Sequence, residues 1–173
     1  MNSDAKHKSR LGVTLIQLAV TVAVLLSSAG GTYTYLHRRA LATEAAKNLR
    51  VIYMALRWYE MENGQLPDLA FFPADPRNDD DSLLYALGKY GVTEQITVCP
   101  SAPATLQAEG LNYLWNARLS KKKLHEIPAG EWMLVEIHAL SPTVPRPHLG
   151  KYTILRANGQ VEFSREPPPG VPI

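Results

Sequence analysis

The sequence predicts an α+β fold, in which one long N-terminal helix packs on a small antiparallel β-sheet. Three observations predict it: an uncharged apolar segment near the start of the chain, an amphipathic segment that continues it without a proline, and an Asn158-Gly159 turn between two short alternating stretches near the end. Once this helix is set aside, the rest of the 173 residues is enough for one small domain with a single core.

The uncharged segment lies between Arg10 and Arg38. It covers about 26 residues, from Leu11 to Leu36, and about 20 apolar residues are enough to cross a bilayer as a helix. Leu, Val, Ala and Ile dominate it, which suits lipid, where every backbone polar group must bond within the segment. We therefore predict a basic leader over residues 1–12 and a transmembrane helix over residues 13–36.

Charge is distributed unevenly around this segment, because Lys6, Lys8 and Arg10 precede it with only Asp4 against them. By the positive-inside rule, the short N-terminus stays cytoplasmic and the rest of the chain lies on the other side. The formal net charge is +2, and the leader alone accounts for three basic residues and one acid. A mature chain near neutrality lacks the positive surface that nucleic-acid binding needs, so no nucleic-acid partner is expected.

Residues 37–63 continue the helix as an amphipathic stalk. Apolar side chains recur there at steps of three or four, which marks one helical face that we expect the sheet to cover; they are Leu41, Ala45, Leu49, Ile52, Leu56 and Tyr59. Asn63-Gly64 predicts the end of the helix, and Pro67 prevents its continuation.

Residues 64–166 are predicted to form the globular α+β domain, followed by a proline-rich tail over 167–173 that we expect to be disordered or extended. A loop precedes a short helix over 82–89, which Asp80 or Asp81 would cap. Strands are expected over 96–100, 111–115 and 132–137. The last strands form a hairpin over 152–163, in which Asn158-Gly159 suits a type I′ turn.

The run Leu11-Gly12-Val13-Thr14-Leu15-Ile16-Gln17-Leu18 resembles the processing site of type IV pilins and type II secretion pseudopilins. The resemblance implies that a prepilin peptidase cleaves between Gly12 and Val13 and methylates the new N-terminus at Val13. It implies a pilin-like fold, a single pass through the bacterial inner membrane and a periplasmic C-terminal domain. The implied partners are other pseudopilin subunits, an inner-membrane assembly platform and membrane lipid. Shorter landmarks also resemble pseudopilin-like chains: Glu62 to Pro67, Cys99-Pro100-Ser101, Asn112-Tyr113 and Gly150 to Phe163.

Two residues after the predicted cleavage site are candidates for filament assembly. The Thr14 hydroxyl can bond to backbone in its own helix or in a neighbouring subunit. The family usually carries a glutamate where this chain has Gln17, and that acid is thought to pair with the N-terminal amine of the adjacent subunit. Glutamine accepts a hydrogen bond but does not neutralise an amine. Two interpretations stay open: a minor, tip-located subunit, or a polar residue without a role.

The sequence offers no catalytic constellation, so neither an enzyme nor a cofactor is predicted. Asp79 and Asp81 are weak candidates for a structural calcium site, but a solvated acidic loop explains them without a defined ligand spacing. The five histidines show no metal-ligand spacing, and the lysines at 121–123 fit a solvated surface. Cys99 could be a reactive thiol beside Pro100, but a lone buried or half-buried cysteine is the commoner case.

An ordinary secretory signal is the alternative for the N-terminal segment, because small residues at Ser27 to Gly30 could be cleaved. The protein would then be an exported or membrane-anchored binding domain with no filament role. Against this, the helical pattern continues past such a site without a break.

Overall fold

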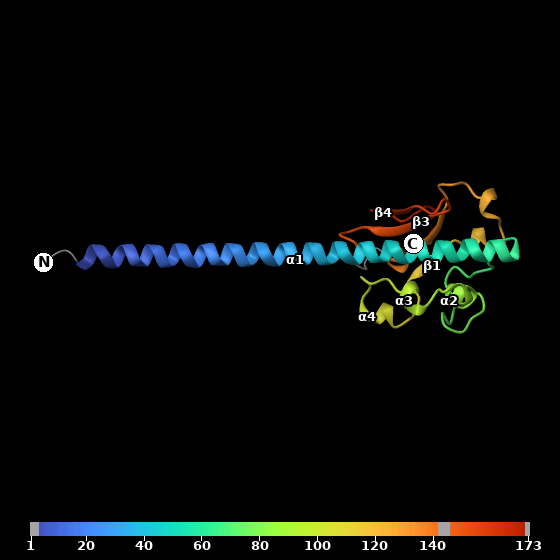
Figure 1. Ribbon diagram of the computed structural model, residues 1–173, viewed down its shortest axis with the longest axis horizontal. Helices are drawn as coiled ribbons and strands as arrows, with labels where there is room; N and C mark the ends of the chain where they lie inside the picture. The colour runs from blue at the N-terminus through green and yellow to red at the C-terminus, as the bar shows by residue number, and fades with distance from the viewer. Residues whose placement is uncertain (1–3, 142–145, 172–173) are drawn as a thin grey trace. The chain divides into compact units, whose positions relative to one another are not determined.

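The computed structural model describes residues 4–141 and 146–171, and within helix α1 it leaves out the side chains of 4–13, 28 and 29 (Figure 1). The chain divides into two compact units, Met1–His37 and Arg38–Ile173. Helix α1, Asp4–Asn63, contributes to both. It begins inside the predicted leader, nine residues earlier than the expected start at Val13.

The described part of the first unit is helical throughout. Its described side chains from Thr14 onward are exposed, including large apolar ones such as Leu15, Ile16 and Leu26. Among the residues that the structure describes, α1 is the one helix long and apolar enough to cross a membrane.

In the second unit, the last turns of α1 provide one side of the main core. Leu49, Ile52 and Leu56 are completely buried, as the spacing of apolar residues predicted, whereas Tyr59 is half-buried at the edge. The same core contains side chains from three strands: Tyr113, Trp115, Met133, Leu134 and Leu155. Gly64, with φ +78°, follows the end of α1 and donates its N–H to Glu60 O at 2.7 Å.

The sheet has four antiparallel strands in the order of the chain: β1 Tyr113–Trp115, β2 Trp132–Glu136, β3 Tyr152–Arg156 and β4 Val161–Ser164. Tyr113 lies opposite Glu136, and Val135 opposite Ile154. This arrangement confirms the predicted α+β layout and three of the four predicted strand regions.

A smaller core covers the other face of the sheet, where Leu114, Val135 and Ile154 pack with Val171. The Trp132 indole N–H donates to Pro169 O at 3.0 Å. The described residues of the C-terminal tail, predicted to be disordered or extended, therefore contact the sheet, because a buried indole N–H and an apolar sheet face both require a partner.

Two local predictions in the globular unit are wrong. Helix α2, Leu83–Leu87, is capped by Ser82, whose Oγ accepts the Leu84 N–H at 3.2 Å, and not by Asp80 or Asp81. Residues 96–100 do not form a strand, because helix α3, Glu94–Thr97, occupies the start of this range. The remaining short helices are η1 Gly88–Tyr90, α4 Ala104–Gln107, η2 Ala117–Leu119, η3 Leu124–Glu126 and η4 Ile137–Leu140.

The hairpin between β3 and β4 turns differently from the expected type I′ geometry. Gly159 has φ +81°, but Asn158 is not among the described residues with positive φ. Arg156 O accepts the Gly159 N–H at 2.9 Å, and the Arg156 N–H donates to Gln160 O at 2.8 Å. These bonds form a turn followed by a glycine bulge, the common three-residue hairpin loop.

Candidate functional site

The predicted processing site lies in the N-terminal part of α1. The backbone of Gly12 and Val13 is helical, but the side chain of Val13 is not among those the structure describes. Thr14 and Gln17, the two candidate assembly residues, are exposed on the same helix. The structure therefore presents both side chains without covering them.

Three hydroxyl groups of the apolar segment bond to the backbone of their own helix. They donate to carbonyls three or four residues earlier, at 2.8 to 2.9 Å: Thr21 to Gln17 O, Ser27 to Ala23 O and Thr34 to Gly31 O. Such bonds satisfy a hydroxyl without water. This segment therefore presents apolar surface even at these polar positions, which suits a lipid or helix-packed environment.

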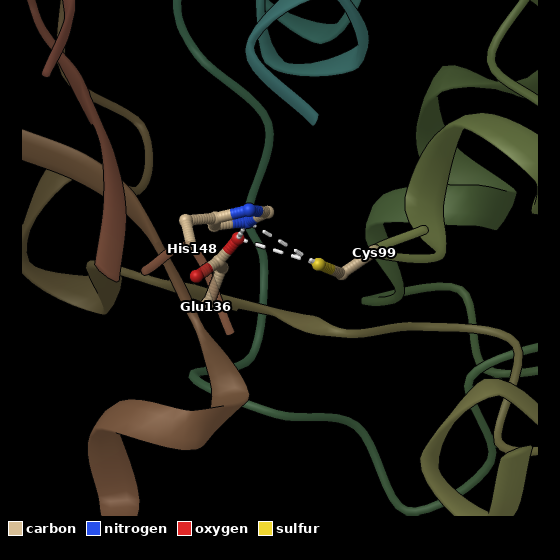
Figure 2. A group of neighbouring side chains, drawn as sticks. All are labelled: Cys99, Glu136 and His148. Atoms are coloured by element: carbon tan, nitrogen blue, oxygen red, sulfur yellow. Dashed lines mark hydrogen bonds and ion pairs between the residues drawn. The ribbon is translucent and has the colours of Figure 1, made fainter. Parts of the chain in front are cut away.

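A cluster of three polar side chains is buried in the globular unit (Figure 2). The imidazole Nε2 of His148 lies 2.5 Å from Oε1 of Glu136. The Cys99 thiol lies 3.3 Å from the same carboxylate oxygen and 3.7 Å from the same imidazole nitrogen. All three side chains are at most 2% exposed. We call these residues the Cys-Glu-His cluster.

Three separate segments bring the cluster together. Cys99 follows α3, and its N–H donates to the Asn112 side chain at 3.0 Å, which ties this loop to the start of β1. Glu136 is the last residue of β2. His148 precedes β3, and its N–H donates to Lys151 O at 3.3 Å.

Neighbouring groups orient two members of the cluster. Ser101 Oγ lies 3.3 Å from Nδ1 of His148, on the side of the ring away from Glu136. The Thr153 N–H donates to Oε2 of Glu136 at 3.1 Å. Both partners leave the remaining atoms, Nε2 and Oε1, directed at the thiol, as Figure 2 shows.

The Cys99 thiol is poorly suited to nucleophilic catalysis. Burial raises its pKa far above the ordinary value, and the charge of Glu136 raises it further, so the thiol of the metal-free protein stays protonated at neutral pH. In addition, the carboxylate and the thiol both contact Nε2 of His148. A nucleophile–base–acid relay needs them on opposite ring nitrogens.

Several other buried polar atoms border the Cys-Glu-His cluster. Among the described residues, the buried side-chain atoms that lack a hydrogen-bond partner are the Tyr113 hydroxyl, both ring nitrogens of His138 and the Thr153 hydroxyl. Tyr113 lies opposite Glu136 in the sheet, and burial, with a further contribution from the charge of Glu136, raises the pKa of its hydroxyl. Burial lowers the pKa of His138, which favours a neutral ring.

The acidic loop does not form a comparable cluster. Asp79 accepts the N–H of Asp75 at 2.7 Å, and Asp81 is exposed. Within the described ranges, the Cys-Glu-His cluster is the one group of three or more Cys, His, Asp or Glu residues whose ligand atoms lie together. Of the three lysines at 121–123, Lys121 pairs with Asp68 at 2.6 Å on the surface.

Sequence reasoning did not find the Cys-Glu-His cluster. It predicted a buried or half-buried Cys99, and the Cys99-Pro100-Ser101 and Asn112-Tyr113 landmarks do meet through the Asn112 side chain. Glu136 and His148, however, lie 37 and 49 residues from Cys99 along the chain, and no local spacing connects them. The available signal was Glu136 itself, a charged residue that directly follows the apolar stretch 132–135.

Comparisons of this chain with protein-family models, with curated proteins and with solved structures gave no match.

Proposed function

We propose that the chain is a pseudopilin, a structural subunit of a type II secretion or type IV pilus-like filament. A prepilin peptidase cleaves it between Gly12 and Val13 and methylates the amine of Val13. The mature chain crosses the bacterial inner membrane once, keeps its C-terminal domain in the periplasm and enters the filament through its N-terminal helix. Its partners are the peptidase, other pseudopilin subunits, the assembly platform and lipid.

The proposal rests on the two different parts of α1, one exposed and apolar and the other buried in the domain core. From Thr14 to Leu36 the described side chains are exposed and mainly apolar, and hydroxyls there bond to their own helix. From Ala45 to Leu56 the same helix contributes buried side chains to the core of the globular unit. A helix that serves both as apolar segment and as domain core is what a pilin-like subunit requires. The α+β layout of the second unit supports the same assignment.

Gln17 assigns the chain a special place in that filament. The proposed partner of this position is the amine of an adjacent subunit, and an amide can accept its hydrogen bond without neutralising its charge. We therefore propose a minor, tip-located subunit. At the tip, an acid at position 17 is not needed to pair with the N-terminal amine of an adjacent subunit. Its role is structural and not enzymatic.

The N-terminal residue of the mature protein tests the proposal. We expect expression in a bacterium that contains a prepilin peptidase to yield a chain that begins with N-methylated Val13, as read by mass spectrometry. Gly12→Ala should leave the leader attached, because the peptidase needs an unobstructed backbone at the cleaved bond.

Gly31→Ala is the matched control, since a Cβ at Gly31 meets no atom within 4 Å. This variant should be processed like the wild type. A mature chain that starts near Gly30 would contradict the proposal in favour of a secretory signal. An intact Met1, in a host that processes another prepilin, would contradict it in favour of a simple anchor.

A further inference from the structure

The Cys-Glu-His cluster combines one sulfur, one oxygen and one nitrogen ligand atom. These three atoms all lie within 4.8 Å of one another. Thiolate, carboxylate and imidazole are the protein ligands of zinc, which accepts mixed sulfur, nitrogen and oxygen sets. We propose that Sγ of Cys99, Oε1 of Glu136 and Nε2 of His148 bind a single zinc ion.

The distances within the cluster are close to those of a tetrahedral site. Zinc bond lengths of about 2.3 Å to sulfur and 2.0–2.1 Å to nitrogen or oxygen place two ligand atoms about 3.3 to 3.6 Å apart. The observed separations from Cys99 Sγ are 3.3 Å to the carboxylate and 3.7 Å to the imidazole. Only the distance between Oε1 of Glu136 and Nε2 of His148, which is 2.5 Å, must increase, by about 0.9 Å, to admit the ion.

The surroundings provide the supporting contacts that a metal site needs. A histidine ligand is oriented by a hydrogen bond at its second ring nitrogen, and Ser101 Oγ occupies that position on His148. The Thr153 N–H fixes the second oxygen of Glu136 in the same way. Both bonds leave the ligand atoms free to face the ion.

The charge of the ligands and the unpaired polar atoms near them also favour a bound cation. A thiolate and a carboxylate together carry two negative charges, which a divalent ion neutralises in a buried pocket. Two buried hydroxyls without a partner among the described residues belong to residues beside Glu136: Tyr113 lies opposite it in the sheet, and the backbone N–H of Thr153 bonds to it. Native interiors rarely leave such atoms unpaired, and a water bound to the ion would offer a partner to a hydroxyl that faces it.

The ion would connect three segments that are separated in sequence. Cys99 lies 37 residues before Glu136, which lies 12 residues before His148. The chain has one cysteine, so no disulfide can form within it. The zinc site would supply this cross-link and stabilise the globular unit by closing both loops. The inference does not depend on filament assembly, since its test reads metal and not processing.

Metal content of the full chain tests the site. Because the ligands are buried, the protein should be expressed in zinc-supplemented medium and purified in mild detergent without chelator. We expect about one zinc per chain by elemental analysis. Cys99→Ser and His148→Gln should lose it, whereas the matched control His125→Gln, at an exposed histidine, should retain it.

A second measurement uses the wild-type chain alone, since a variant at a buried position can fail to fold. Protein expressed with cobalt in place of zinc should show a thiolate-to-cobalt charge-transfer band and the strong visible absorption of tetrahedral cobalt. Wild-type protein that retains no stoichiometric zinc overturns the proposal. So does a cobalt spectrum without the thiolate band, because the ion would then lie elsewhere.

Discussion

Ser82 illustrates how single side chains hold the globular unit together. It is completely buried, and its hydroxyl serves two segments: it accepts the Leu84 N–H at 3.2 Å and donates to Pro76 O at 2.5 Å. The residue therefore both caps α2 and closes the preceding loop. The exposed Asp81 beside it contributes only its backbone carbonyl, which accepts the Ala70 N–H at 3.1 Å.

Substitution of the cap residue Ser82 should destabilise the domain, whereas substitution of the neighbouring Asp81 should not. We expect Ser82→Ala to lower the free energy of unfolding by about 1–2 kcal/mol, because the partly buried Leu84 N–H and the buried Pro76 carbonyl lose their partner. Asp81→Ala, the matched control, should change it by less than about 0.5 kcal/mol. Urea unfolding followed by tryptophan fluorescence measures both, and equal losses would contradict the assignment of Ser82 as the cap.

At the scale of elements, local sequence patterns predicted the helices and strands in which no distant contact favours another conformation. The end of α1 at Asn63 follows from Gly64, and β2 follows from an apolar stretch bounded by polar residues. Residues 96–100 contain β-branched side chains that favour a strand. Backbone bonds from Thr97 to Thr93 and from Val98 to Glu94 instead close a helical turn, and the Thr97 hydroxyl donates to Gly110 O at 2.6 Å. That distant contact is invisible in the sequence.

The turn between β3 and β4 was mispredicted for a similar reason. Asn-Gly suits a type I′ turn in an isolated hairpin. Here the Ala157 and Asn158 N–H groups donate to Glu131 O and Ala129 O, so the loop before β2 fixes the turn in another geometry. The Tyr53 hydroxyl of α1 also donates to Ala157 O at 3.2 Å.

The contact of this turn with α1 gives a prediction for Gly159. Its φ is +81°, and a Cβ there would lie 2.6 Å from Cε1 of Tyr53. Gly159→Ala should lower the free energy of unfolding by at least about 1–2 kcal/mol, since both the backbone and the close approach resist a side chain. Thermal unfolding monitored by circular dichroism measures the loss.

Gly130→Ala is the control for this substitution, because a Cβ at Gly130 meets no atom within 4 Å and its φ is not positive. It should leave the melting temperature within a few degrees of the wild-type value. A Gly159→Ala protein as stable as Gly130→Ala would show that the hairpin turn does not dock on α1.

At the scale of the whole molecule, the two units differ in how far the sequence predicts them. The first is defined by composition alone, because absence of charge over about 26 residues is a local property. The Cys-Glu-His cluster of the second exists only after β1, β2 and β3 have paired, since each ligand comes from a different segment. Local spacing rules therefore apply to the apolar segment and fail for the buried cluster.

The proposed membrane position of the first unit predicts a strong response to charge. Val24 lies near the middle of residues 13–36 and is exposed. Val24→Lys should weaken insertion by about 2.5–3.5 kcal/mol, the cost of a lysine at the centre of a transmembrane helix. Carbonate extraction of membranes should then release much of the chain, which the wild type resists.

Met54→Lys serves as the control, because Met54 is an exposed residue of α1 within the globular unit. This variant should remain in the membrane fraction like the wild type. Equal extraction of wild type and Val24→Lys would contradict a transmembrane position for the segment.

The complete burial of Cys99 also makes this chain its own reporter of fluctuations. A reagent that alkylates thiols has one possible target in the protein, and that target is inaccessible until the loop after α3 separates from β2. The rate of alkylation in the native state is therefore proportional to the population of that open form. Bound zinc would slow the labelling in proportion to its occupancy. A timed alkylation reaction, with no cysteine added by mutagenesis, would then follow local opening of the domain in detergent, in membranes or in an assembled filament.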